Sequence, residues 1–224
     1  METLTKAEDM GNPSKNGLRS QALSLAEACN YEETHTEQVC KLSLSLFDQL
    51  FPLHGLGRKE RAFLEAAAIL HDIGWIKGQK KHHKISQELI VNSEKLSISK
   101  NERILVGLIA RYHRKSLPKA SHEYFAGLDK VSRQIVTKLA SFLRLADGLD
   151  RSHRSAIDRL HCEIFPKQLL LRISTKYLPL EDIETAREKS DLITKVFKRK
   201  LRIVKDLSPT HYKGDAAEHN GVIS

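Results

Sequence analysis

The chain has 224 residues and a formal net charge of +9 at pH 7, a length that suits one domain with a smaller appendage. It contains no run of eighteen apolar residues and starts on a polar segment, so we expect no membrane span, no secretory signal and a cytoplasmic location. Cys29, Cys40 and Cys162 form no CxxC pair, which argues against a zinc knuckle or a disulfide framework, while the positive charge favours anionic partners.

Apolar stripes and breakers divide the chain into a disordered tail at 1–16, a helical part at 17–155, a small α+β unit at 156–206 and a flexible tail at 207–224. In the helical part we expect six helices, at about 18–29, 34–51, 58–72, 86–94, 100–113 and 132–150. A turn, FPLHGLG, follows the second helix, and a basic loop, KGQKKHHK, follows the third. In the last unit we expect strands at 160–165, 168–174 and 201–204 and a helix at 180–198. The fold class is therefore mainly α: a helical bundle followed by a small α+β unit.

A histidine–aspartate pair ends the third expected helix. His71 shares a helix face with Leu64 and Ala68, so it points toward the core, and Asp72 follows it. Because burying such groups without a partner is costly, the pair indicates a bound cation.

Two further ligand types occupy core-facing positions on other helices. His35 continues the apolar stripe of the second helix, and Asp147 borders the stripe of the long helix. With His71 and Asp72 they form a mixed imidazole and carboxylate set, which suits Mn, Fe, Co, Ni or Zn, with Mg also possible.

Three more histidines can extend this set. His113 ends its helix on the same face as the apolar residues before it, while His82 and His83 lie in the basic loop. If His113 and one of these two join, six ligands could hold two ions, with Asp72 as the bridging carboxylate.

Cations surround the candidate ligands. Arg144, Asp147 and Arg151 share one helix face, a pattern typical of a phosphate clamp. Arg111, Arg114 and Lys115 surround His113 in the same manner. The alternative for Arg144 and Arg151 is a structural salt-bridge network with Asp147 and Asp150.

The order His35, His71–Asp72, Asp147 resembles the HD phosphohydrolase superfamily. The segments AAAILHDIG, KHHKIS, LIARYHRKSLPK and LASFLRLADGLDRSH resemble the C-terminal HD region of the exopolyphosphatase and guanosine-pentaphosphate phosphatase family, over about residues 18–205. The resemblance implies a helical HD core and a phosphoanhydride or nucleotide substrate. It also implies metal bound at His35, His71, Asp72 and Asp147, with His82 or His83 and His113 as additional ligands.

The sequence departs from this family in two places. Full-length members carry actin-like ATPase domains ahead of this region, and nothing in this sequence has their α/β pattern or a glycine-rich phosphate loop. Where the family often has HHKHS, this chain has HHKIS, which leaves His82 and His83 as alternatives for the second-metal ligand.

We therefore predict a metal-dependent phosphohydrolase that acts on a phosphate ester or anhydride of the nucleotide, alarmone or polyphosphate class. The ion would activate water, Asp72 would orient it, and His83 or His153 could protonate the leaving group. Charge on the phosphoryl oxygens would be offset by Arg111, Arg114, Lys115, Arg144 and Arg151.

The alternative function is a non-catalytic regulatory module that binds polyphosphate, an alarmone or RNA in a basic cleft. Nucleic acid is not the favoured partner, because the basic residues lack interleaved aromatic residues that stack on bases. A homo-oligomer is possible.

Overall fold

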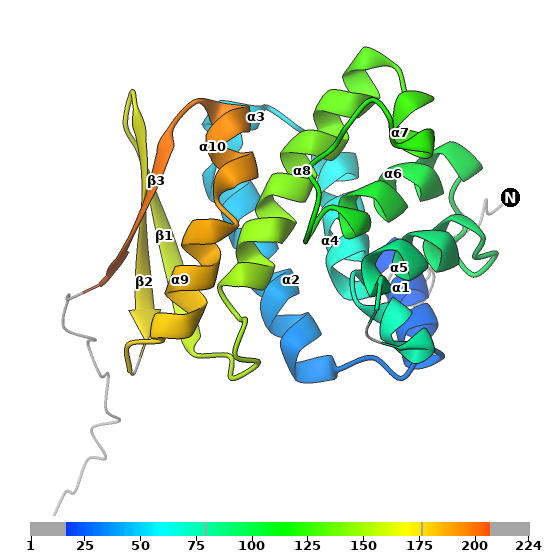
Figure 1. The fold of residues 1–224 in the computed structure, drawn as a ribbon, viewed down its shortest axis with the longest axis horizontal. Helices are drawn as coiled ribbons and strands as arrows, with labels where there is room; N and C mark the ends of the chain where they lie inside the picture. The colour runs from blue at the N-terminus through cyan, green and yellow to red at the C-terminus, as the bar shows by residue number, and fades with distance from the viewer. Residues whose placement is uncertain (1–16, 79, 176, 207–224) are drawn as a thin grey trace, which may run out of the picture.

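The computed structural model describes residues 17–78, 80–175 and 177–206, and the two tails expected at 1–16 and 207–224 lie outside them. The helices of the first part are α1 (Leu18–Glu27), α2 (Glu33–Gln49), α3 (Phe51–His54), α4 (Arg58–Leu70), the 3-10 helix η1 (Ile73–Lys77), α5 (His82–Val91), α6 (Lys100–Arg111), α7 (Glu123–Ala126) and α8 (Lys130–Gly148). The later elements are β1 (Ile157–Ile164), β2 (Gln168–Thr175), α9 (Leu180–Glu188), α10 (Asp191–Phe197) and β3 (Lys200–Lys205). The prediction of a mainly helical bundle followed by a small α+β unit is confirmed (Figure 1).

Helix α8 is the central element of the molecule. It begins after Asp129, whose carboxylate accepts a hydrogen bond from the backbone N–H of Ser132 at 2.9 Å, an N-cap that satisfies one free donor of the first turn. Its last two turns are buried, because α2, α4 and α6 pack against it from the bundle and α9 and α10 from the small unit. The C-terminal end of α8 therefore lies where the two parts of the fold meet.

The small unit is a three-stranded sheet covered by two helices. Strand β2 is central and pairs antiparallel with β1 and parallel with β3. Leu169, Leu171 and Ile173 alternate along β2 and are buried, which is the expected pattern for a sheet covered on one face. The parallel pair requires a crossover connection, and α9 and α10 provide it between the sheet and α8 (Figure 1).

Helix α2 also ties the sheet to the bundle. The side-chain amide of Gln38 donates to the carbonyl of Ile157 at 2.6 Å, and that of Gln49 donates to the carbonyl of Leu160 at 3.0 Å. These bonds connect residues more than one hundred positions apart, so they fix the sheet relative to the first helices.

Three local expectations are wrong. The expected turn at 51–57 contains the one-turn helix α3. His82 and His83 begin α5 instead of lying in a loop, because Lys81 adopts a left-handed conformation (φ 62°) and turns the chain directly into the helix. The helix expected at 180–198 is interrupted between α9 and α10, where the carboxylate of Asp191 accepts the N–H of Leu192 and competes with the helical bonding pattern.

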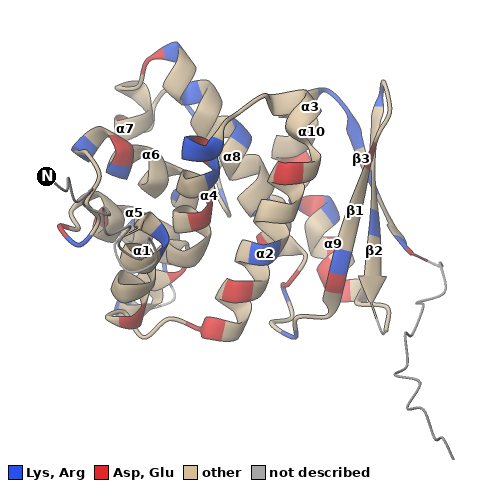
Figure 2. Cartoon of the chain, turned by 180° about the vertical axis from the view of Figure 1, so that it is seen from behind, with Lys and Arg blue, Asp and Glu red and all other residues tan. Residues whose placement is uncertain are grey.

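Charged residues of both signs are spread over the fold. In the view of Figure 2, Lys and Arg alternate with Asp and Glu across the helices and strands.

Candidate functional site

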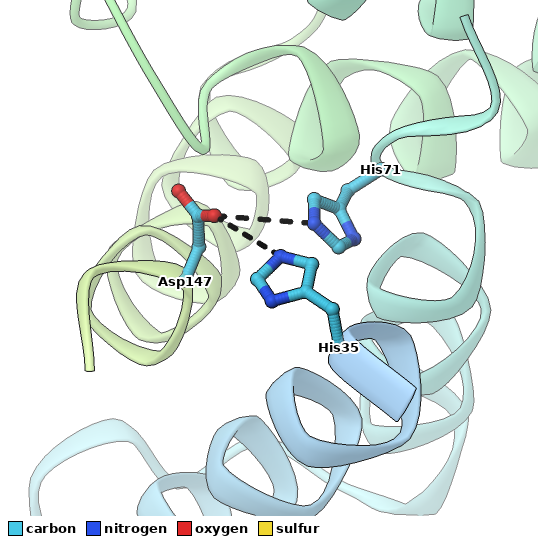
Figure 3. A group of neighbouring side chains, drawn as sticks. All are labelled: His35, His71 and Asp147. Atoms are coloured by element: carbon cyan, nitrogen blue, oxygen red, sulfur yellow. Dashed lines mark ion pairs between the residues drawn. The ribbon is translucent and has the colours of Figure 1, made fainter. Parts of the chain in front are cut away.

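The structure brings His35, His71 and Asp147 together from three helices. His35 lies in the first turn of α2, His71 directly follows α4, and Asp147 lies near the end of α8 (Figure 3). Oδ1 of Asp147 is 3.6 Å from Nε2 of His35 and 4.0 Å from Nε2 of His71. These separations are too long for hydrogen bonds but match the spacing of ligand atoms that each lie about 2.1 Å from one ion.

Hydrogen bonds orient the histidine rings with Nε2 toward the site. Nδ1 of His71 donates to the carbonyl of Ala68 at 2.7 Å, and Nδ1 of His113 donates to that of Ala110 at 2.7 Å. A carbonyl only accepts, so Nδ1 carries the hydrogen in both rings and Nε2 keeps its lone pair for a metal.

His35 has a charged orienting partner. Its Nδ1 bonds to Oδ2 of the fully buried Asp150 at 2.9 Å, and the other carboxylate oxygen of Asp150 accepts the N–H of Ser155. Such a carboxylate behind a ligating histidine fixes the ring and raises its basicity.

A second group adjoins the first through Asp72. Oδ1 of Asp72 is 3.2 Å from Nε2 of His82 and 3.4 Å from Nε2 of His113, and its Oδ2 is 3.7 Å from Nε2 of His71. One carboxylate therefore faces both groups, as a bridging ligand would. Each group keeps its possible ligand atoms within 4.8 Å of one another, so each could hold a metal ion.

Three buried polar atoms of these two groups have no hydrogen-bond partner among the described residues: Nε2 of His35, Nε2 of His71 and Oδ1 of Asp72. Leaving a buried polar atom unpaired costs about 1–3 kcal/mol. Bound cations at these positions would satisfy all three atoms, so the residues fit a divalent metal.

Electrostatics keeps the carboxylates ionised. Burial raises the pKa of Asp72, but the imidazoles of His71, His82 and His113 around the carboxylate outweigh burial and hold that pKa well below its usual range. At Asp147 the effect of burial is likewise outweighed, mainly by the ammonium of Lys189, and the pKa is again lowered. Both groups are therefore anionic at neutral pH, as metal ligands must be.

The histidines differ in protonation. Burial lowers the pKa of His113 to about 3, so its ring is neutral. Burial also lowers the pKa of His35, but the neighbouring carboxylates of Asp147 and Asp150 outweigh this effect and raise the pKa to about 10. Without an ion, His35 therefore carries a proton that a metal must displace.

A cavity of about 210 Å³ opens on the second group and is rich in cations. Arg114, Lys115, Arg151 and Lys189 line it together with Asp72 and Asp147. Arg114 also donates to Nε2 of His82 at 3.1 Å. A cavity with carboxylates at its base and guanidinium and ammonium groups on its walls can hold a phosphate group beside metal ions.

Lys189 is a site residue that the sequence analysis misses. It lies in the break between α9 and α10, inside the segment expected to be one helix, and its ammonium forms an ion pair with Oδ2 of Asp147. Gly148 makes this possible, since a Cβ there would lie 2.9 Å from the Cα of Ala186 on α9. Ser190 and Asp191 are residue types that favour the start of a helix, so they could have indicated the break between α9 and α10.

Other predicted residues lie elsewhere. Arg144 forms two hydrogen bonds with Asp191, at 2.8 and 3.2 Å, because its position on α8 faces α10 instead of the cavity. We therefore do not include Arg144 among the phosphate ligands. The salt bridge that it forms is with Asp191, and not with Asp147 or Asp150 as the alternative interpretation had it.

Arg111, expected to bind phosphate, and His83, expected to bind a metal ion or to transfer a proton, also lie outside the two ligand groups. Arg111 donates to the side chain of Gln87 at 2.6 Å. His83 is half-buried, its pKa is lowered to about 4, chiefly by burial, and neither ligand group includes it. His82 and His83 were the two alternatives for the additional metal ligand, and His82 is the one that lies with Asp72 and His113.

His153 lies at the edge of the site. Its ring stacks on that of His35 with centroids 3.8 Å apart, and its Nδ1 bonds to Glu32 at 2.7 Å. It lines the cationic cavity, which makes it the better placed of the two histidines considered for proton transfer.

Residues 19–192 match the family model described as Ppx/GppA phosphatase, domain III. No curated protein matches the chain. In the part of the chain that the structure describes, no helix is both long and apolar enough to cross a membrane.

Proposed function

The chain belongs to the Ppx/GppA phosphatase family, and from this premise we propose that it is an HD-type, metal-dependent phosphohydrolase with two divalent ions. The observation that carries the proposal is the pair of adjoining ligand groups that share Asp72. His35, His71 and Asp147 would hold one ion, and His82 and His113 the other, with Asp72 between them. The three partnerless buried atoms support this assignment.

Bound divalent ions supply a water of lowered pKa at this site. The side chains around the site bind the phosphate and donate a proton. Arg114, Lys115, Arg151 and Lys189 bind the phosphoryl oxygens and offset the negative charge that grows on them. Nε2 of His82 would hold an ion, and the guanidinium of Arg114, which now donates to that nitrogen, would then be free to bind the phosphate.

His153 is the proposed proton donor to the leaving group. Its Nδ1 bonds to Glu32, so Nε2 is the atom that can carry a proton into the cavity. The bond to Glu32 and stacking on His35 fix the orientation of the ring.

In this proposal both parts of the chain contribute residues to the site. Residues 17–155 supply all the ligands, and residues 156–206 supply Lys189 and thereby one wall of the cavity. The small unit is thus part of the site and not a separate binding module.

The test is to measure metal content and phosphatase activity of the full chain with Mn²⁺, with organic phosphates and inorganic polyphosphate as substrates. We expect about two ions per chain, and we expect His71→Ala combined with Asp72→Ala to lower kcat/KM about 10³-fold, or about 4 kcal/mol. His161→Ala is the matched control, because His161 is exposed on β1 away from both groups.

Activity that survives in the double variant would exclude catalysis at this site. Phosphate binding that depends strongly on salt, ignores chelator and is accompanied by no hydrolysis would instead favour a non-catalytic binding module.

A further inference from the structure

A second cavity adjoins the ligand groups and the cationic cavity. It has a volume of about 250 Å³ and is lined by Asn30, Tyr31, Glu32 and Thr36, together with His35 from the first ligand group. Asp72, Trp75 and His153 line both this cavity and the cationic one. The two cavities therefore meet at the proposed ions and at the proposed proton donor.

The two cavities differ sharply in charge. Two arginines and two lysines line the first, whereas no arginine or lysine is among the described residues that line the second. Its two carboxylates belong to Asp72, which the ions would neutralise, and to Glu32, which remains anionic beside His153. A polyanion is held less well in the second cavity than in the first, because Glu32 repels it there and no arginine or lysine among the described lining residues offsets its charge.

The walls of the second cavity suit an uncharged organic group. Tyr31 and Trp75 present aromatic surface, and Trp75 is 43 % exposed, although its ring also stacks on His82. Asn30 and Thr36 offer hydrogen-bonding groups. Since a cavity of roughly 150 Å³ holds benzene, a volume of about 250 Å³ accommodates one ring with its substituents.

We propose that the second cavity binds the uncharged organic part of a phosphate monoester, whose phosphate lies in the cationic cavity. The substrate class is then an organic phosphate monoester and not an inorganic polyphosphate chain. This inference rests on the proposed function for the position of the scissile bond, which would lie between the two cavities next to His153.

The first experiment compares p-nitrophenyl phosphate with tripolyphosphate as substrates of the full chain with Mg²⁺. We expect kcat/KM to favour the aromatic ester at least tenfold. Glu32→Lys places a cation in the second cavity, so this ratio should fall at least tenfold. Glu33→Lys is the matched control, since it makes the same charge change one residue away, at an exposed position that does not line the cavity, and it should leave the ratio unchanged.

Comparing ratios removes any general effect of Glu32 on catalysis through His153. Equal use of the two substrates by the unmodified chain, or a ratio that Glu32→Lys does not alter, would overturn the assignment.

The second experiment needs no turnover. Trp75 is the only tryptophan of the chain, so its fluorescence reports binding in either of the two cavities that it lines. Phenyl phosphate should bind at least tenfold more tightly than inorganic phosphate, and Glu32→Lys should remove most of this preference.

The two experiments separate this inference from the proposed function. If neither substrate is hydrolysed but phenyl phosphate keeps its advantage in binding, the hydrolase proposal fails and the cavity assignment stands. If hydrolysis occurs but phenyl phosphate binds no better than inorganic phosphate, the cavity assignment fails.

Discussion

Gly74 allows α5 to approach the proposed metal site, and replacing it by alanine should separate the candidate ligands. A Cβ at Gly74 would lie 2.2 Å from the carbonyl oxygen of His82 and 2.7 Å from the backbone nitrogen of Ser86. Both are backbone atoms that cannot rotate away, and ordinary contact begins near 3.4 Å. The start of α5 must therefore move by about 1 Å in a close-packed interior. The same movement stretches the contact between His82 and Asp72, now 3.2 Å.

We expect Gly74→Ala to lower the free energy of unfolding by about 3 kcal/mol, at the upper end of the usual range for overpacking. For a domain of this size the Tm should fall by roughly 6–12 °C. Because His82 leaves the second group, the metal content should fall from two ions to one. Thermal unfolding followed by circular dichroism and metal analysis of the purified variant measure these two effects.

Gly127→Ala is the control for the loss of a glycine. It has an ordinary helical φ of −76°, and a Cβ there meets nothing closer than 3.7 Å. Its Tm should stay within about 2 °C of the unmodified chain. If Gly74→Ala behaves like this control and still binds two ions, α5 is not held at the site by close backbone packing, and the reasoning is refuted.

Four further predictions concern individual residues in or near the site. Because His35 has a pKa of about 10 without metal, an ion must displace its proton, so Mn²⁺ affinity measured by calorimetry should rise about tenfold per pH unit from pH 7 to 9; an affinity that does not vary with pH contradicts this. That raised pKa also contributes stability to the metal-free protein that is fully present below pH 6.5 and is lost as the pH rises through about 10, so its Tm should fall over the upper part of this interval. Lys189→Met should weaken inorganic phosphate binding about tenfold. It should tighten Mn²⁺ binding, because a cation that pairs with Asp147 is removed. Unchanged phosphate binding, or equal weakening by Lys189→Arg, would count against a role of Lys189 in phosphate binding. Arg144→Ala should cost roughly 1 kcal/mol of stability through its ion pair and leave KM unchanged, whereas Arg151→Ala should raise KM and leave Tm unchanged; the opposite pattern would restore Arg144 to the phosphate site.

The elements with strong periodicity could be predicted from the sequence. Helix α8 has apolar residues on one face and a capping aspartate, and β2 alternates buried and partly exposed residues, so local pattern alone identifies both. The apolar stripes of the helices also show that His35, His71 and Asp147 occupy core-facing positions, so the sequence alone points to these three residues.

Contacts between distant elements could not be predicted in this way. Nothing local shows that Arg144 faces Asp191, 47 residues later, or that the break after α9 directs Lys189 onto Asp147. The start of α5 depends on the left-handed conformation of Lys81, which sequence patterns rarely indicate for a lysine. Helical periodicity therefore pointed to the candidate ligands, while the residues that line the cavity beside them depended on tertiary packing.

The long sequence separations within the site have a consequence for synthesis of the chain. His35 bonds to a residue 115 positions later, and Glu32 to one 121 positions later. A ribosome adds about 5–20 residues per second, so α2 waits roughly six to thirty seconds for α8 and α9. During that interval the nascent chain exposes the apolar faces of α2 and α4. Chaperone capture of this intermediate should therefore be strongest before residue 147 leaves the exit tunnel.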